Sequence, residues 1–122
     1  MPTDTPTVQY RSSLVRVVIV HESPRPCFAL ADALRGRYVV RMAHALGDLR
    51  DQLGVLERLA CVVCISGRKL RALDVRDEAV RLGVAPERIV VLGLEELEPL
   101  DRALVTIREA IESFDPTTRL AS

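Results

Sequence analysis

The sequence contains no tryptophan and few other aromatic residues, which together make up 3% of the chain. Without aromatic side chains there is no stacking platform for single-stranded nucleic acid or for a flat heterocycle. The chain also lacks an excess of charge, because 17 Lys and Arg residues balance 17 Asp and Glu residues. A neutral chain does not supply the positive field that attracts duplex DNA or an anionic membrane, so we expect neither as a partner.

Long apolar runs are absent as well. The longest run, Leu14 to Val20, is interrupted by Arg16 and falls far below the roughly 20 residues that span a bilayer. Residues 1–13 are polar and lack the apolar core of a secretory leader, so we expect a flexible N-terminal tail and a cytoplasmic protein. Residues 14–114 are expected to form one α/β domain with a buried core, followed by a C-terminal tail over 115–122.

Cysteine is scarce, with three residues at positions 27, 61 and 64. An odd number of cysteines is typical of a reducing compartment. Cys61 and Cys64 have the spacing of a redox dithiol, but they lie inside an apolar run that is typical of a strand. Residues three apart in a strand point to opposite faces of the sheet. The sequence therefore predicts that Cys27, Cys61 and Cys64 are small buried hydrophobic residues.

Motifs for cofactors and catalysis are missing too. There are no spaced glycines of a Walker loop or a dinucleotide fingerprint and no Gly-x-Ser-x-Gly elbow. The two histidines, His21 and His44, do not belong to a cluster with metal-ligand spacing. His21 and Glu22 could act as acid and base or hold a divalent ion, but neighbours on an extended segment point in opposite directions. We therefore predict no metal, no cofactor and no catalytic residue.

Short continuous apolar runs, rich in Val and Ile, alternate four times with longer stretches of helical spacing. Branched side chains favour strands. Because the runs do not alternate apolar with polar residues, both faces of each strand should be covered, as in a parallel sheet between helices. The predicted strands are Leu14 to Val20, Tyr38 to Met42, Ala60 to Ile65 and Arg88 to Leu92.

Four amphipathic helices follow the strands. Gly36 and Gly83 suit the ends of the first and third helix, and Pro99 suits the first turn of the last. The order predicts an α/β fold, a three-layer, doubly wound parallel sheet of four strands, with any fifth strand disguised between Gly93 and Pro99. The apolar stripes are Cys27, Leu30, Ala31 and Leu34; Leu46, Leu49, Leu53 and Leu56; Ala72, Val75, Ala79 and Leu82; and Leu100, Ala103, Leu104, Ile107, Ile111 and Phe114.

Ligands and partners of an open parallel sheet bind at the carboxyl ends of its strands. Ser66 and Gly67, followed by Arg68 and Lys69, could hold a phosphate there with backbone N–H groups and two cations. The alternative interpretation is a serine N-cap, a glycine turn and solvated cations. The notable charge runs, which are more often solvated faces, are Arg68, Lys69 and Arg71, and Glu95, Glu96 and Glu98.

Several segments match a known family in order. VRVVIV is followed by His21, Glu22, Ser23 and Pro24, where that family has an apolar strand, two acidic residues, any residue and proline. ALADALRGRYVVRMAHALGDLRDQL is similar to its first helix, second strand and second helix, ACVVCIS to its third strand, and EPLDRALVTIREAI to its closing Lys-Pro turn and final helix. The chain over residues 15–114 thus resembles the receiver domain of bacterial response regulators, which implies a flavodoxin-like or receiver-like fold.

The departures from the receiver pattern decide what the resemblance implies. In receivers the paired acids hold magnesium, and an aspartate that ends the third strand takes the phosphoryl group. The strand-end positions are occupied here by His21, Glu22, Ser66 or Ile65, Gly93 and Glu98. One acid and the phosphoacceptor are therefore absent, a glycine stands for a hydroxyl residue, and a glutamate stands for a lysine. The resemblance implies a degenerate receiver, or pseudo-receiver, that is not phosphorylated.

We therefore expect a non-enzymatic module of bacterial signal transduction that binds a regulatory protein. Homodimer formation through an edge strand or a terminal helix would cover the exposed sheet edges. The alternative is a small nucleotide- or phosphate-binding protein that uses the loop from Ser66 to Lys69. Residues 64–93 are also similar to a strand-helix-strand unit of nucleotide-sugar enzymes. A third interpretation is a hydrolase built on Ser66 and His21.

Overall fold

The computed structural model describes residues 15–54 and 58–114, so the predicted tails, Leu14 and Leu56 lie outside the described residues. The strands are β1 (Arg16–Val20), β2 (Val39–Ala43), β3 (Leu59–Ile65) and β4 (Ile89–Leu92). The helices are α2 (Phe28–Leu34), α3 (Leu46–Leu53), α4 (Ala72–Arg81) and α5 (Leu100–Phe114), and the 3-10 turns are η1 (Arg25–Cys27), η3 (Pro86–Arg88) and η4 (Leu94–Leu97).

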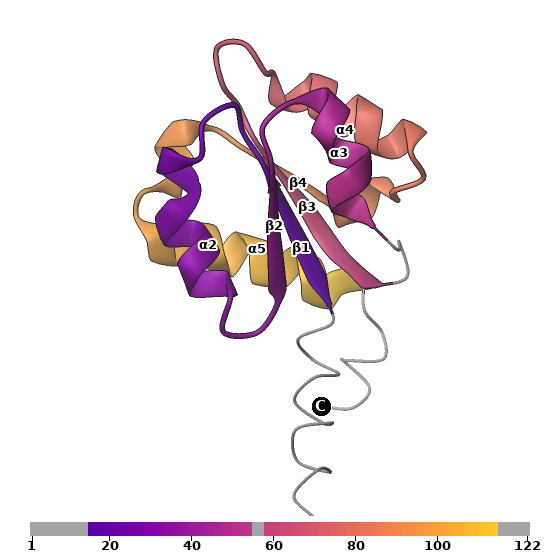
Figure 1. Cartoon of the computed structure of the whole chain (residues 1–122). Helices are drawn as coiled ribbons and strands as arrows, with labels where there is room; N and C mark the ends of the chain where they lie inside the picture. The colour runs from indigo at the N-terminus through magenta and orange to yellow at the C-terminus, as the bar shows by residue number, and fades with distance from the viewer. Residues whose placement is uncertain (1–14, 55–57, 115–122) are drawn as a thin grey trace, which may run out of the picture.

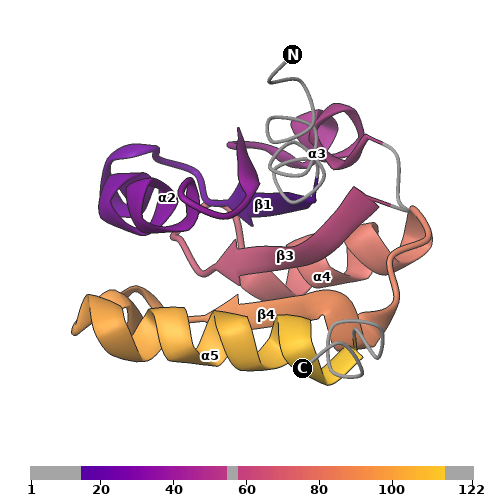
Figure 2. The same cartoon turned by 90° about the horizontal axis from the view of Figure 1, so that it is seen from below.

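All strand pairs are parallel, and the sheet has the order β2-β1-β3-β4. Helices α2 and α5 cover one face of the sheet, and α3 and α4 cover the other (Figure 1). In the view from below, the strands lie as a layer between the helices (Figure 2). The predicted three-layer, doubly wound parallel fold is therefore confirmed, with the strand order of flavodoxin-like proteins.

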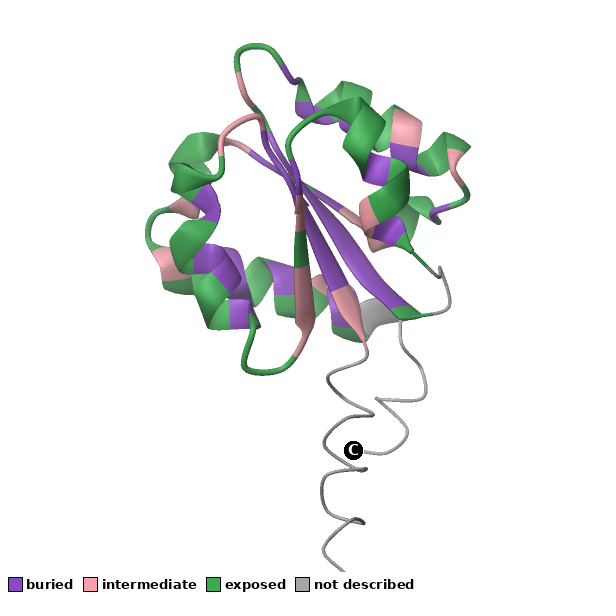
Figure 3. Ribbon diagram, in the orientation of Figure 1, coloured by how far each residue is buried: buried purple, intermediate pink, exposed green. Residues whose placement is uncertain are grey.

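The central strand β3 is buried at every residue, from Leu59 to Ile65 (Figure 3). Its side chains alternate between two cores because successive residues of a strand point to opposite faces. Cys61 belongs to the core under α2 and α5, and Cys64 belongs to the core under α3 and α4. The prediction that the two thiols lie on opposite faces is confirmed, and all three cysteines are free and buried.

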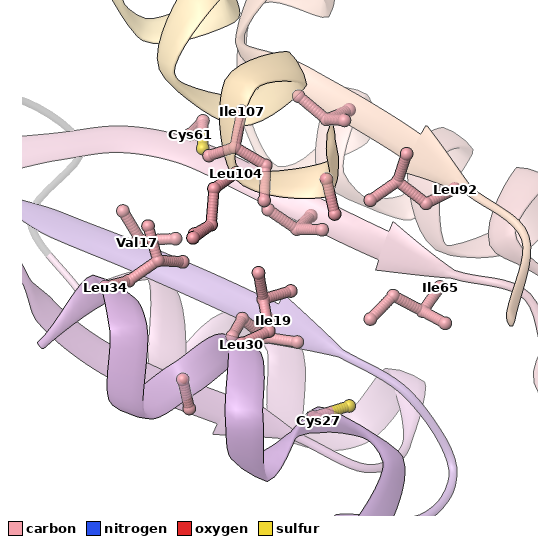
Figure 4. Close-up of a cluster of buried hydrophobic side chains, with 14 of the residues drawn as sticks. Val17, Ile19, Cys27, Leu30, Leu34, Cys61, Ile65, Leu92, Leu104 and Ile107 are labelled. Carbon is pink, nitrogen blue, oxygen red and sulfur yellow. The ribbon is translucent and has the colours of Figure 1, made fainter. Parts of the chain in front are cut away.

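The core under α2 and α5 is made of aliphatic side chains from these helices and from β1, β3 and β4, together with Cys27 and Cys61. Leu30 and Leu34 from α2 lie over Val17 and Ile19 of β1, and Ile107 of α5 lies near Cys61 (Figure 4). Side chains at i and i+4 share one face of a helix, so a short helix of seven residues still presents a continuous apolar stripe. The predicted stripes of α2 and α5 therefore supply helical side chains to this core.

Element boundaries differ from the predictions by one or two residues. Strand β2 begins at Val39 instead of Tyr38, and β4 begins at Ile89 instead of Arg88. Leu46 was expected in the buried stripe of α3, but it is 38% exposed because it is the first residue of the helix and lies beyond the core. Leu49 and Leu53 are buried as predicted.

The segment that could have hidden a fifth strand, from Gly93 to Pro99, contains the 3-10 turn η4, so the described residues form a four-stranded sheet. The turn is closed by Glu96, whose Oε1 accepts the N–H of Gly93 at 2.7 Å. Such local side-chain bonds compete with strand pairing. Within the described ranges, no helix has both the length and the apolar character needed to span a membrane.

Helix α4 ends as predicted. Gly83 follows it with a φ of 108°, a conformation that glycine adopts without steric cost. The N–H of Val84 then bonds to the carbonyl of Ala79 at 3.0 Å and closes the helix end. This turn directs the chain into η3 and the edge strand β4.

Candidate functional site

The carboxyl ends of β1 and β3 lie side by side where the strand order reverses. Val20, the last residue of β1, pairs with Cys64 of β3 on one side and with Ala43 of β2 on the other. The loops that begin at His21, His44 and Ser66 therefore start at the same end of the sheet. This switch point is where open α/β sheets bind ligands, and it brings together the loops that follow β1, β2 and β3.

His21 is the single buried polar side chain of the described residues, with 3% of its surface exposed. Its Nδ1 lies 3.1 Å from the carbonyl oxygen of Ile65. Because a carbonyl oxygen only accepts hydrogen bonds, Nδ1 must carry the proton in this contact. The backbone N–H of His21 also donates to Ala43 O at 3.1 Å. His21 therefore joins the ends of β1, β2 and β3.

His44 supports the same loop from the neighbouring strand. Its Nδ1 donates to the carbonyl oxygen of His21 at 3.0 Å. Two imidazole rings thus bond to the main chain at the ends of three adjacent strands. The sequence does not predict this arrangement, because the partners of both rings are backbone carbonyl groups, which every residue has.

Glu22 links the loop after β1 to the loop after β3. Its Oε1 accepts the backbone N–H of Lys69 at 2.7 Å and that of Leu70 at 3.0 Å. The bonds from Leu70 and Lys69 hold the pKa of the Glu22 carboxyl below its usual value, because they stabilise the charged form. As predicted for neighbours on an extended segment, His21 is buried whereas Glu22 remains partly exposed.

The Glu22 carboxylate also explains the glycine at position 67. A Cβ atom on Gly67 would overlap Glu22 Oε1 and lie 2.7 Å from Glu22 Cδ. Any other residue would displace the carboxylate from the amides of Lys69 and Leu70. The glycine therefore leaves room for the Glu22 carboxylate, which comes from another loop.

In the predicted anion-binding loop, Ser66 to Lys69, a carboxylate of the chain itself takes the place of an external anion. The amides of Lys69 and Leu70, which would face a phosphate, donate to Glu22. The interpretation of Ser66 as an N-cap is wrong, since the N-cap residue of α4 is Arg71, which forms no side-chain capping bond. Glu22 satisfies the preceding amides instead.

The remaining predicted positions lie on the connection from β4 to α5. The backbone N–H of Ser66 donates to Leu92 O at 3.0 Å, which places the start of this connection beside the loop after β3. Gly93 is held by Glu96, and Glu98 is exposed. The Ser66 side chain makes no hydrogen bond with His21 in the described part of the chain.

A groove of about 430 Å³ opens between α2 and the connection from β4 to α5. The wall from η4 and α5 is built from leucines that alternate with glutamates in the segment LEELEPL. In the sequence this segment looks like a solvated charge run, and nothing there shows that its leucines line a groove. The lining residues are Pro26, Ala29, Leu30, Leu94, Leu97, Glu98 and Leu100.

Within the described ranges, no three His, Cys, Asp or Glu side chains are close enough together to hold a metal ion. The fold is that of an open, doubly wound α/β protein with an all-parallel sheet. The carboxyl ends of its strands, with His21, Glu22, His44 and Ser66, form what we call the rim. Comparisons with protein-family models, with curated proteins and with solved structures find no match to this chain. The arrangement of the rim residues therefore carries the functional argument.

Replacing Glu22 by Gln should lower stability near neutral pH and make it less sensitive to acid. The lowered pKa of Glu22 means that its contribution is present above the ordinary value of 4.5 and is lost as pH falls through the folded-state pKa. The melting temperatures of wild type and Glu22→Gln should therefore converge as pH falls from about 7 to about 3. Asp77→Asn, on the exposed side of α4, is the control. A difference that stays constant over this range would contradict the assigned role of Glu22.

Proposed function

We propose that this chain is a non-enzymatic protein-protein interaction module of bacterial regulation, a receiver-like domain that does not accept a phosphoryl group. The observation that carries the proposal is the engagement of Glu22 with the amides of Lys69 and Leu70. Glu22 is the one carboxylate that directly follows β1, and it ties two loops together. A carboxylate used in this way stabilises the rim instead of holding a reactive group.

The end of β3 supports the same proposal. Ile65 is the last residue of the strand and is 1% exposed, and its carbonyl oxygen bonds to His21. The next residue, Ser66, is exposed, and a serine hydroxyl without a base is a weak nucleophile. The described groups at this end therefore suit a rigid platform for binding another protein.

Anion binding by the loop from Ser66 to Lys69 is the less favoured function. An external phosphate would have to displace Glu22 from the amides of Lys69 and Leu70. Those amides do bind an anionic group, the Glu22 carboxylate. Binding of a phosphate or nucleotide by this loop therefore remains a proposal. Self-association also remains a proposal, supported by the outer edges of β2 and β4, which pair with no further strand among residues 15–54 and 58–114.

Incubation with acetyl phosphate and magnesium should add no phosphoryl group to the chain. Intact-mass spectrometry measures the product, and a receiver that is phosphorylated under the same conditions serves as the positive control. Thermal shift with nucleotides and inorganic phosphate, run in parallel, should give no stabilisation. A labelled chain would contradict the proposal, and Ser66→Ala would show whether Ser66 carries the label. Stabilisation by phosphate would favour the anion-binding function.

A further inference from the structure

We propose that the groove between α2 and η4 binds a basic amphipathic helix of a partner protein. This inference rests on the proposed function and deepens it by naming the class of partner. Apolar side chains of the helix would enter the groove, and its Lys or Arg residues would face the acidic residues along one wall. Helices dock in this mode through anchors at i, i+3 or i+4, and i+7.

The groove is apolar where an anchor would enter it. Leu30 of α2 is 1% exposed and forms the inner surface, whereas Leu94 of η4 is 45% exposed and stands at the opening. Leu97 and Leu100 are partly buried and complete the wall. The volume of about 430 Å³ lies within the range of sites that enclose apolar groups. A leucine as exposed as Leu94 gains most from being covered.

The segment that forms η4 and the start of α5 is acidic, and its Glu98 lines the groove. Glu95, Glu96, Glu98 and Asp101 are all exposed, and in the described part of the chain the ion pairs join Arg35 to Asp32 and Arg81 to Glu78. The four carboxylates are thus not neutralised by an ion pair within those ranges. Arg102, which adjoins Asp101, is the cation nearest to them in the sequence. A positively charged partner face complements this excess of negative charge.

A second copy of the chain fits the groove less well. The exposed face of α4 offers Leu73 and Val80 at i and i+7, and the exposed residues Asp74, Arg76 and Asp77 give this helix charges of both signs. Such a mixed face complements the acidic residues of η4 and the start of α5 less well than a basic helix does. A contact of α4 with the groove would also join two different surfaces, which produces open-ended chains unless the rotation closes.

The test uses a fluorescent synthetic helix of about 18 residues, with leucines at helical spacing and lysines elsewhere, and a twin peptide in which glutamates replace the lysines. Fluorescence anisotropy of the full chain should show saturable binding of the basic peptide that weakens at high salt. The acidic twin should bind about tenfold more weakly or not at all. Equal binding of both peptides would overturn the assigned charge of the partner.

Matched variants locate the binding surface. Leu94→Gln should weaken binding of the basic peptide about tenfold, as expected for an anchor contact, whereas Leu73→Gln, an exposed leucine on the other face, should leave it within about twofold. Glu95→Lys with Glu98→Lys should weaken it about fivefold, and Asp77→Lys with Glu87→Lys, the same change of charge elsewhere, should not. Glu96 is left intact because it bonds to Gly93. Thermal unfolding confirms that each variant folds.

Equal effects of Leu94→Gln and Leu73→Gln would overturn the inference. So would a concentration-dependent dimer that Leu94→Gln abolishes without any peptide binding, since the groove would then hold a second copy. Binding of a small apolar dye alone would overturn it in favour of a small-molecule pocket. If the peptide does not bind and acetyl phosphate adds no label, the groove inference fails while the proposed function stands.

Discussion

Replacing Ile107 by Ala is expected to lower the free energy of unfolding by about 2–5 kcal/mol. Ile107 is fully buried on α5, in the core that joins this helix to α2 and the sheet (Figure 4). Removal of its side-chain atoms loses transfer free energy and leaves a cavity that close-packed neighbours fill incompletely. Because domains of this size unfold with about 5–15 kcal/mol, the loss is a large fraction of the total. Urea denaturation followed by circular dichroism measures it.

Val105→Ala is the matched control for this change. Val105 lies two residues earlier on the same helix and is 50% exposed. Its truncation should alter the free energy of unfolding by no more than about 0.5 kcal/mol. Equal losses for Val105→Ala and Ile107→Ala would contradict the orientation of α5 on the sheet.

The two strand cysteines should react with a thiol reagent far more slowly in the folded chain than in denaturant. Burial raises the pKa of both Cys61 and Cys64 to about 12, from an ordinary value of 9.0. The raised pKa lowers the fraction of thiolate, which is the reacting form, and burial keeps the reagent away until the structure opens. Reaction of the chain with Ellman's reagent at about pH 8, with and without denaturant, measures the ratio.

Two further variants control the thiol experiment. Leu73→Cys places a thiol at a position where the native side chain is 62% exposed, and it should react at once in the folded chain. Ile107→Ala should accelerate labelling of Cys61 and Cys64, because buried thiols react through opening of the structure. Rapid labelling of Cys64 in the wild type would show that the core under α3 and α4 is open.

The same pKa shifts predict how stability depends on alkaline pH. The unfolded thiols ionise near the ordinary value of 9.0, whereas Cys61 and Cys64 remain protonated in the folded chain. The unfolded state therefore releases protons first, and stability falls as pH rises above about 9.

Much of the architecture could be predicted from local pattern. The runs of Val and Ile predict strands because branched side chains and two-sided burial act on each residue and its neighbours. The opposite faces of Cys61 and Cys64 follow from the two-residue period alone. The exposure of Leu46 could not be predicted, because helical periodicity identifies a face of a helix and does not show where that helix extends past the core.

The candidate site was predicted in position but not in its contacts. The carboxyl ends of the strands and the residues His21, Glu22 and Ser66 are all where the order of elements places them. No local signal showed that Glu22, and not Ser66, would satisfy the amides before α4. The leucines of η4 were also missed, because a charge run next to apolar residues reads as a solvated face until the opposite wall from α2 is known.

The amino-acid sequence by itself determined the number and order of the strands and α-helices, since each depends on periodicity and turn residues within a short window. Only the tertiary structure decided which residues meet at the rim. Glu22 and Lys69 are 47 positions apart, and they come together because β1 and β3 pair in register and end at the same edge of the sheet. Such a contact depends on the strand order and register of the whole sheet, which no local window contains.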